Sequence, residues 1–309
     1  MMANKDMTLG FKLLSAYYIG GVSKADVASL AKEKEINWGY IEFESKINQM
    51  KNELLKSDTF KFWSSWRKSL LSMTSQAVAI NFIVVTLKDW ERKGMPTNSS
   101  SSAHKSFIKN SLITFDQLVY EYITNQWKGS SDSRIKGNLI ELETKDNIFP
   151  AIPNNKWIEL IEEVFQGRLN GKEYSNTDSV EKKIKLLLLY YYTISEIGGP
   201  DFSIVDDYDF DHIISKSEIK QSGSLFVKKN VSNIFNIAAL PKRDNILKND
   251  KPLNRINETW LKQQIEKYSE IPVSRFDEYS HPSSMEELYE FRLKKFKDAF
   301  DTNRTGILG

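Results

Sequence analysis

One short stretch of the sequence combines residue types that can do chemistry. Asp211 stands directly before His212, and it is followed by Asn236, then by Asn245 nine residues later, and by Lys248 three residues after that. Carboxylate and amide oxygens are the ligands that a hard divalent cation such as Mg²⁺ prefers. An imidazole, with an ordinary pKa near about 6.5, accepts a proton at neutral pH. These residue types are suited to a reaction in which a bound metal ion and a general base act together.

The segment from residue 209 to residue 249 resembles the HNH, or ββα-metal, nuclease motif, in residue types and in spacing. The resemblance implies metal-dependent hydrolysis of phosphodiester bonds in DNA. It implies that His212 is the general base and that Asp211 and Asn245 hold Mg²⁺ or Mn²⁺. A site with so few protein ligands completes its coordination with waters and phosphate oxygens.

Two further roles follow from the same resemblance. Asn236 is expected to bridge the loop that holds the histidine, with Asn233 as the alternative for this role. Lys248 lies one helical turn past Asn245 and is expected to hold a phosphate oxygen. Asp209 is expected to support the site as a structural acid rather than to bind the metal.

The motif needs particular elements to position its residues. Adjacent residues on a strand point to opposite faces, so Asp211 and His212 can share a site only where the strand ends or bends. The family places a loop between two short strands and a helix after them. In this chain, residues 226–231 or 234–240 are the candidates for the second strand, and the helix is expected from Pro241 onward.

Many HNH nucleases carry two Cys-x-x-Cys pairs for a structural zinc, and this chain has no cysteine. Pro241 and Asp244 stand where the second pair would lie. We therefore expect no structural zinc, and the surrounding fold must support the motif.

Local charge supports an anionic partner although the chain has a net charge of only +2. Residues 216–255 hold nine Lys and Arg against three acidic residues, whereas residues 201–211 hold five Asp and no basic residue. A basic strip beside a nuclease motif favours phosphate binding. The expected DNA contacts are Lys216, Lys228, Lys229, Lys242, Arg243 and Lys251.

The wider sequence resembles the C-terminal nuclease part of GmrSD-type modification-dependent restriction endonucleases. The Asp-His-Ile start, the aliphatic run after Asn236 and residues 249–253 (NDKPL) carry this resemblance. It implies a role in a bacterial anti-phage restriction system and a ParB-like nucleotide-hydrolysing partner. The Asp-Gly-Gln-Gln-Arg motif of that partner is absent, as is a Walker A sequence, so the partner is a separate chain or this chain is a fragment.

The remaining sequence predicts a mainly α protein with a small α+β insertion. We expect a helical domain over residues 1–197 with a flexible Ser-rich loop at 94–106, an HNH segment over 198–255, and C-terminal helices over 256–309. Two apolar stretches, 77–86 and 184–194, are too short to cross a bilayer and are expected in the core of a cytoplasmic protein. Periodicity and helix-start signals predict the helices 23–34, 39–56, 77–90, 114–127, 155–165, 179–197, 258–268 and 284–302.

The two other histidines do not suggest chemistry. His104 lies in the Ser-rich segment and is expected at the surface, and His281 precedes a helix-start signature at Pro282. Two alternative functions stay open. The chain is a non-catalytic nucleic-acid-binding or scaffold module with a decayed site, or it is an RNase or toxin.

Overall fold

The computed structural model describes residues 2–30, 32, 40–65, 74–129, 131–145, 149–173, 178–195, 197 and 208–308. Helices dominate these residues, and the two sheets found among them are antiparallel pairs of strands. The predicted fold class, mainly α with a small α+β insertion, is confirmed. The contacts group the chain into two compact units, residues 1–152 with 308–309, and residues 153–307.

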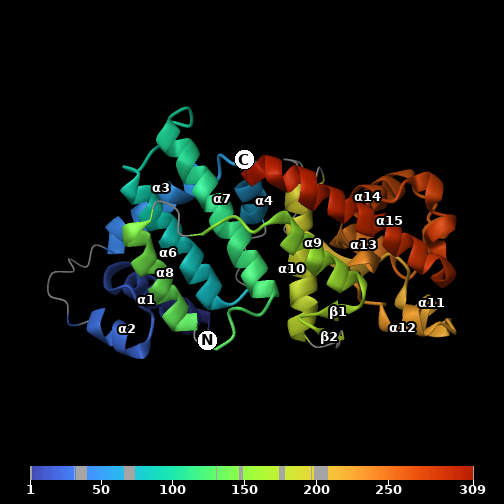
Figure 1. Cartoon of the computed structure of the whole chain (residues 1–309). Helices are drawn as coiled ribbons and strands as arrows, with labels where there is room; N and C mark the ends of the chain where they lie inside the picture. The colour runs from blue at the N-terminus through green and yellow to red at the C-terminus, as the bar shows by residue number, and fades with distance from the viewer. Residues whose placement is uncertain are drawn as a thin grey trace. The chain divides into compact units, whose positions relative to one another are not determined.

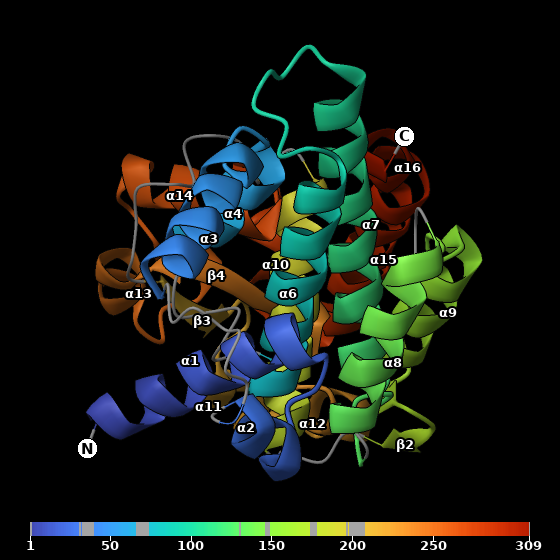
Figure 2. The same ribbon diagram turned by 90° about the vertical axis from the view of Figure 1, so that its left-hand side faces the viewer.

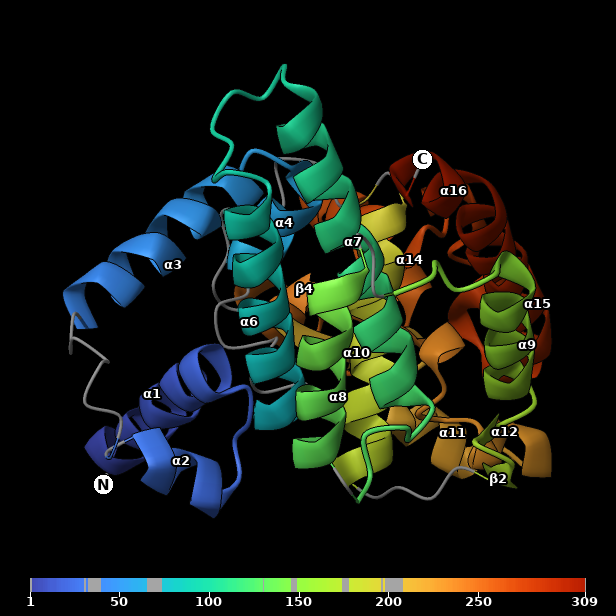
Figure 3. The ribbon, with the colours of Figure 1, turned by 60° about the vertical axis from the view of Figure 1, so that its left-hand side comes forward.

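Among the described residues of the first unit, all regular elements are helices. Helices α6, α7 and α8 lie side by side in it (Figure 3). The predicted core stretch 77–86 falls on α6, where Val78, Val84 and most residues between them are buried. Its helices are α1 (Met2–Ile19), α2 (Lys24–Leu30), α3 (Tyr40–Leu54), α4 (Asp58–Ser65), α6 (Gln76–Arg92), α7 (Ser102–Ile123) and α8 (Ser131–Thr144).

Helix α2 begins at a reciprocal capping contact that the sequence predicts. The backbone N–H of Asp26 donates to Ser23 Oγ over 3.1 Å, and the backbone N–H of Ser23 donates to the Asp26 carboxylate over 2.9 Å. Each contact satisfies a backbone donor that the first turn of a helix leaves free. The hydrogen bonds from Ser23 also lower the pKa of Asp26.

The Ser-rich segment predicted as a loop over residues 94–106 is helical in its second half. Helix α7 starts at Ser102, because Ser101 caps it with a side-chain oxygen, a role in which serine is strongly favoured. The preceding loop is tied to α6, where Trp90 Nε1 donates to the carbonyl of Pro96 over 3.3 Å. The loop prediction was therefore wrong from residue 102 onward.

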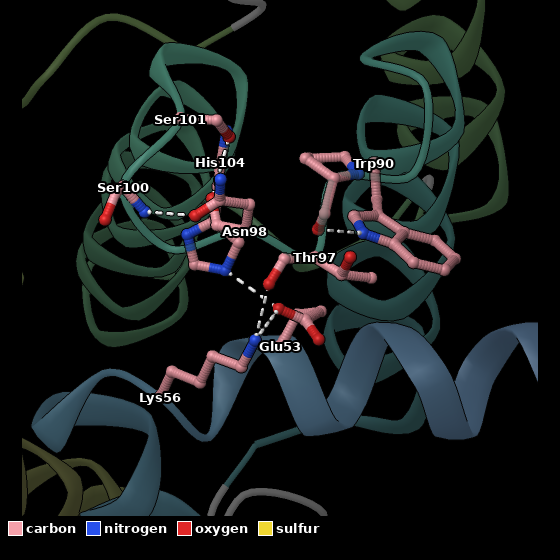
Figure 4. Close-up of polar contacts among 9 residues, drawn as sticks. Glu53, Lys56, Trp90, Thr97, Asn98, Ser100, Ser101 and His104 are labelled. Carbon is pink, nitrogen blue, oxygen red and sulfur yellow. Dashed lines mark hydrogen bonds and ion pairs between the residues drawn. The ribbon is translucent and has the colours of Figure 1, made fainter.

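The expected surface position of His104 was also wrong. Its side chain is buried, and its Nε2 lies 3.0 Å from Glu53 Oε2 on α3 (Figure 4). Lys56 Nζ lies 2.6 Å from the same carboxylate oxygen and donates to the carbonyl of Thr97 over 2.7 Å. The cluster joins α3 to the start of α7. His104 is therefore a structural residue of the first unit.

The second unit contains the candidate motif (Figure 1). Its α-helices are α9 (Asn154–Phe165), α10 (Asp178–Ile194), α11 (Lys216–Gln221), α12 (Leu225–Lys229), α13 (Lys242–Lys248), α14 (Thr259–Ser269), α15 (Met285–Asp298) and α16 (Arg304–Leu308). Its strands are β1 (Arg168–Leu169), β2 (Lys172–Glu173), β3 (Tyr208–His212) and β4 (Ile237–Pro241). Short 3₁₀ turns are η3 (Ile234–Asn236), η4 (Leu253–Arg255), η5 (Val273–Arg275), η6 (Glu278–Ser280) and η7 (Pro282–Ser284), and a π-helical turn η8 (Ala299–Asn303) follows α15.

The two-unit division differs from the three domains expected at residues 1–197, 198–255 and 256–309. Helices α9 and α10 group with the motif, because α9 packs on α15 and α10 packs on η3 and η8. The predicted core stretch 184–194 on α10 is nearly all buried. No helix among the described residues is long and apolar enough to cross a bilayer.

We predict that His104→Ala lowers the free energy of unfolding by roughly 1–3 kcal/mol, because it leaves the buried Glu53 carboxylate with one partner fewer. Urea unfolding, with hydrogen exchange at α7 amides as the local readout, measures this. The matched control is Lys105→Ala at the exposed neighbouring position, which we expect to change stability by less than about 0.5 kcal/mol. Equal effects of the two variants would contradict the structural role of His104.

Candidate functional site

Strands β3 and β4 form a two-stranded antiparallel sheet, here called the hairpin, with α11, α12 and η3 between its strands in the chain, and α13 follows β4 directly (Figure 2). The register pairs Asp211 with Ala238 and His212 with Ile237. Pro241 ends β4 and caps α13, which suits a residue that fixes φ and has no N–H to donate. Of the two segments predicted as the second strand, residues 234–240 contain it, because β4 begins at Ile237. The alternative prediction, residues 226–231, was wrong because α12 occupies most of this segment.

Four polar side chains meet where α13 packs on β3. Asp209 and Asp211 are two residues apart on the strand and therefore share one face. Asn245 Nδ2 donates to Asp209 Oδ2 over 3.2 Å, and Lys248 Nζ lies 2.5 Å from Asp211 Oδ2. Lys248 is 1% exposed and also donates to the carbonyl of His212 over 2.9 Å. We call these four side chains the α13 cluster.

Within the α13 cluster, the charge of Asp211 is balanced by that of Lys248. Burial raises the pKa of Asp211, and the Lys248 ammonium together with the backbone N–H of His212 counteracts this rise. A buried ammonium is tolerated when a carboxylate and further hydrogen bonds compensate its lost hydration. The ion pair of Lys248 and Asp211 therefore fastens α13 to β3.

The α13 cluster has the donor chemistry of a site for a hard divalent cation. Two carboxylates, Asp209 and Asp211, and the amide oxygen of Asn245 are oxygen donors of the kind that Mg²⁺ takes. Lys248 is a competing cation for one of these carboxylates. Within the described ranges, no group of three or more His, Cys, Asp or Glu side chains could hold a metal.

The imidazole of His212 belongs to the other face of the hairpin. It is the last residue of β3, and Phe210, two residues before it, has Lys185 of α10 5.1 Å above its ring. Burial lowers the pKa of His212 to about 4, and the positive charges of Lys216 and Lys248 add to this effect against the opposing charge of Glu181. The ring is therefore neutral at pH 7.

The same imidazole has a buried nitrogen without a hydrogen-bond partner among the described residues. Its Nε2 has no hydrogen-bond partner in the part of the chain that the structure describes. Most buried polar atoms in proteins are paired, so an unpaired ring nitrogen at a strand end is a candidate proton acceptor.

Asn236 lies where the bridging asparagine is expected. It is fully buried, and its Oδ1 accepts the backbone N–H of Ile214 over 2.9 Å. Its Nδ2 donates to the carbonyls of Ile214 and Val231, and its own carbonyl accepts the N–H of Ile213 over 2.8 Å. These bonds hold the two residues that follow His212. The alternative, Asn233, instead donates to the carbonyl of Val164 on α9.

The six predicted DNA contacts are all exposed, at the ends of α11 and α12, on the first turn of α13 and in the loop after it. Lys229 is partly balanced by Glu173, whose Oε1 lies 3.8 Å away. The guanidinium of Arg243 lies 5.8 Å from the ring centre of Trp260, an exposed side chain that the sequence analysis did not single out. In the Asp-rich segment 201–211, residues 201–207 lie outside the described part of the chain.

The structure thus brings together some of the predicted residues and separates others. In the α13 cluster Lys248 pairs with Asp211 and Asn245 pairs with Asp209, the two aspartates being on one face of β3. By strand alternation the imidazole of His212 falls on the opposite face of β3, where the charge of Lys248 still acts on it. The ammonium of Lys248 is occupied by Asp211 and by the backbone, whereas a phosphate contact was expected for it.

No protein-family model, curated protein sequence or solved structure matches this chain. The functional interpretation therefore depends on the residues and geometry of the hairpin and α13.

We predict that Asp211→Asn and Asn245→Ala each weaken Mn²⁺ binding by about tenfold or more, because the first removes the negative charge of one ligand and the second removes a ligand oxygen. Asn at position 211 keeps the side-chain shape beside Lys248. Titration calorimetry of the full chain with Mn²⁺ measures the affinity, and Asp277→Asn, an exposed aspartate on the same unit, is the control. Unchanged affinity in both site variants would mean that any bound metal lies elsewhere.

Proposed function

We propose that this chain is a metal-dependent HNH endonuclease that hydrolyses phosphodiester bonds in DNA. The observation that carries the proposal is the strand–strand–helix unit itself. In it, α13 presents Asn245 and Lys248 to Asp209 and Asp211. Asn236 fixes the residues after the histidine in the same unit.

In this proposal the chain's own groups divide the work. His212 accepts the proton of the attacking water at Nε2, the ring nitrogen that has no partner among the described residues. Asp211 and Asn245, with Asp209 beside them, would hold Mg²⁺ or Mn²⁺. When bound, the cation would stabilise negative charge on the phosphate and on the leaving oxygen.

In this proposal the substrate phosphodiester lies at the end of β3 that carries His212. The α13 cluster and the imidazole project from opposite faces of this strand, and the strand ends at His212. A phosphodiester that lies across the strand end meets both faces. The exposed Lys242 and Arg243 lie on the first turn of α13, near the Tyr208 end of β3 because Tyr208 pairs with Pro241, and would hold backbone farther along the duplex.

A second candidate is a nucleic-acid-binding module without catalysis. The observation that favours it is the buried ion pair of Lys248 and Asp211, which already neutralises one proposed metal ligand. A plasmid-nicking assay with and without Mg²⁺ separates the two candidates. The same assay with an RNA substrate tests the RNase alternative. The sequence resemblance supports the restriction role and the ParB-like partner, and the shortness of the apolar stretches supports the cytoplasmic location.

We predict that His212→Ala lowers the rate of Mg²⁺-dependent plasmid nicking by on the order of 10²–10⁴, because the general base is lost. EDTA should stop cleavage by the unchanged protein without unfolding it. The matched control is His281→Ala, since His281 is exposed and begins the turn before α15. Circular dichroism verifies that both variants fold. Nicking by His212→Ala at the rate of the control would refute the proposed base.

We predict that the double variant Lys242→Gln/Arg243→Gln flattens the slope of log affinity against log salt by about 2, because each phosphate contact releases condensed counterions. Binding should weaken similarly on unrelated duplexes, with much less change in rate at saturating DNA than His212→Ala causes. The control is Lys294→Gln/Lys295→Gln, which removes the same charge from exposed positions on α15. If the control pair flattens the slope equally, DNA does not lie along α13.

A further inference from the structure

Arg292 of α15 is a fully buried cation that is bound to the backbone. Its Nη1 donates to the carbonyls of Ile234 and Phe235 over 3.1 Å each, and to the carbonyl of Ile237 over 2.8 Å. These three carbonyls flank Asn236 on both sides. One guanidinium nitrogen therefore holds the turn from which Asn236 projects.

Two other side chains on the same face of α15, Tyr289 and Phe296, contact the chain segment that leads to Asn236. Tyr289, three residues before Arg292, donates its hydroxyl to the carbonyl of Asn230, and its ring lies 5.8 Å from that of Phe235. Phe296, four residues after Arg292, lies 5.3 Å from Phe235 edge to face. Spacings of three and four residues place all three side chains on one helix face.

The burial of Arg292 is costly and therefore informative. A buried charge is destabilising unless hydrogen bonds replace its hydration. Its Nε and Nη2 have no hydrogen-bond partner in the described part of the chain. The hydrogen bonds that replace the hydration of this guanidinium are therefore those to the three carbonyls. An aliphatic side chain would fill the same space without this cost, which indicates that the hydrogen bonds to the turn are the useful property.

We propose that Arg292 is a positioning residue for the candidate site, acting through Asn236 on the loop that follows His212. The connection is continuous. Arg292 holds the carbonyls beside Asn236, and Asn236 binds the N–H groups of Ile213 and Ile214 through its carbonyl and Oδ1. The ββα unit then depends on α15, which lies outside the motif. The catalytic consequence rests on the proposed nuclease function, but the positioning itself does not.

The test compares three variants of the full chain. Arg292→Met removes the donors and keeps an unbranched apolar stem, and Arg292→Lys restores a cation with donors. Arg304→Met is the matched control, because Arg304 is 1% exposed in the same unit and binds Asn154 Oδ1 instead. Hydrogen exchange at the amides of Ile213 and Ile214, normalised to amides of α6 in the first unit, is the readout that needs no catalysis.

We expect Arg292→Met to speed exchange at these two amides by about tenfold or more relative to α6, Arg292→Lys to reverse part of this change, and Arg304→Met to leave the ratio unchanged. In the nicking assay, Arg292→Met should lower kcat by on the order of 10² with little change in KM, since a small misplacement of a catalytic group costs that much. If Arg292→Met does not fold, Arg292→Lys carries the test, with a smaller change in the same direction.

The two arms fail in different ways. Equal exchange ratios in Arg292→Met and Arg304→Met would overturn the positioning role and leave the nuclease proposal standing. Faster exchange at Ile213 and Ile214 in a protein that never nicks DNA would support the positioning role and refute the nuclease proposal.

Discussion

A hairpin of two five-residue strands is not stable by itself in water, and this constraint governs the second unit. The hairpin of β3 and β4 is held from three directions. Lys248 of α13 pairs with Asp211, and Tyr192 of α10 accepts the N–H of Ala239 over 3.1 Å. Arg292 of α15 holds the turn that leads into β4. With no cysteine in the chain to supply a structural zinc, polar side chains from surrounding helices fasten the motif.

These anchors explain why buried charge is concentrated around the hairpin. Lys248 and Arg292 are both nearly or fully inaccessible, and each is compensated by backbone carbonyls. Hydrogen bonds to charged groups are stronger and more directional than apolar contacts. They specify where a short strand lies, whereas hydrophobic packing tolerates small shifts. A candidate catalytic loop benefits from that precision.

The separation of charge across β3 follows from strand geometry. One face carries Asp209 and Asp211 towards α13, and the other carries Phe210 and His212 towards α10. An ion pair and a neutral imidazole are thereby kept on different sides of one strand. The basic strip is also divided, because Lys248 is buried while the flanking lysines and Arg243 stay exposed. Lys248 therefore contributes to the local excess of positive charge in the sequence but is not exposed to a nucleic acid.

The sequence by itself determined the features that arise from local rules. Periodicity placed most of the helices, Ser23 and Asp26 marked a helix start, and Pro241 marked the change from strand to helix. The resemblance to the HNH motif implied a strand–strand–helix unit, and β3, β4 and α13 form one. These predictions succeeded because capping, φ restriction and helical period act over a few residues.

Only the tertiary structure decided which side chains meet. It buried His104 against Glu53, paired Lys248 with Asp211 instead of leaving it to phosphate, and brought Arg292 to the turn beside Asn236. Such pairs lie tens of residues apart in the chain, and a lysine or arginine has the same sequence signature whether it is solvated or buried. Its partner is chosen by how distant helices pack, because a buried charge must be compensated by whatever group the fold brings within hydrogen-bonding distance.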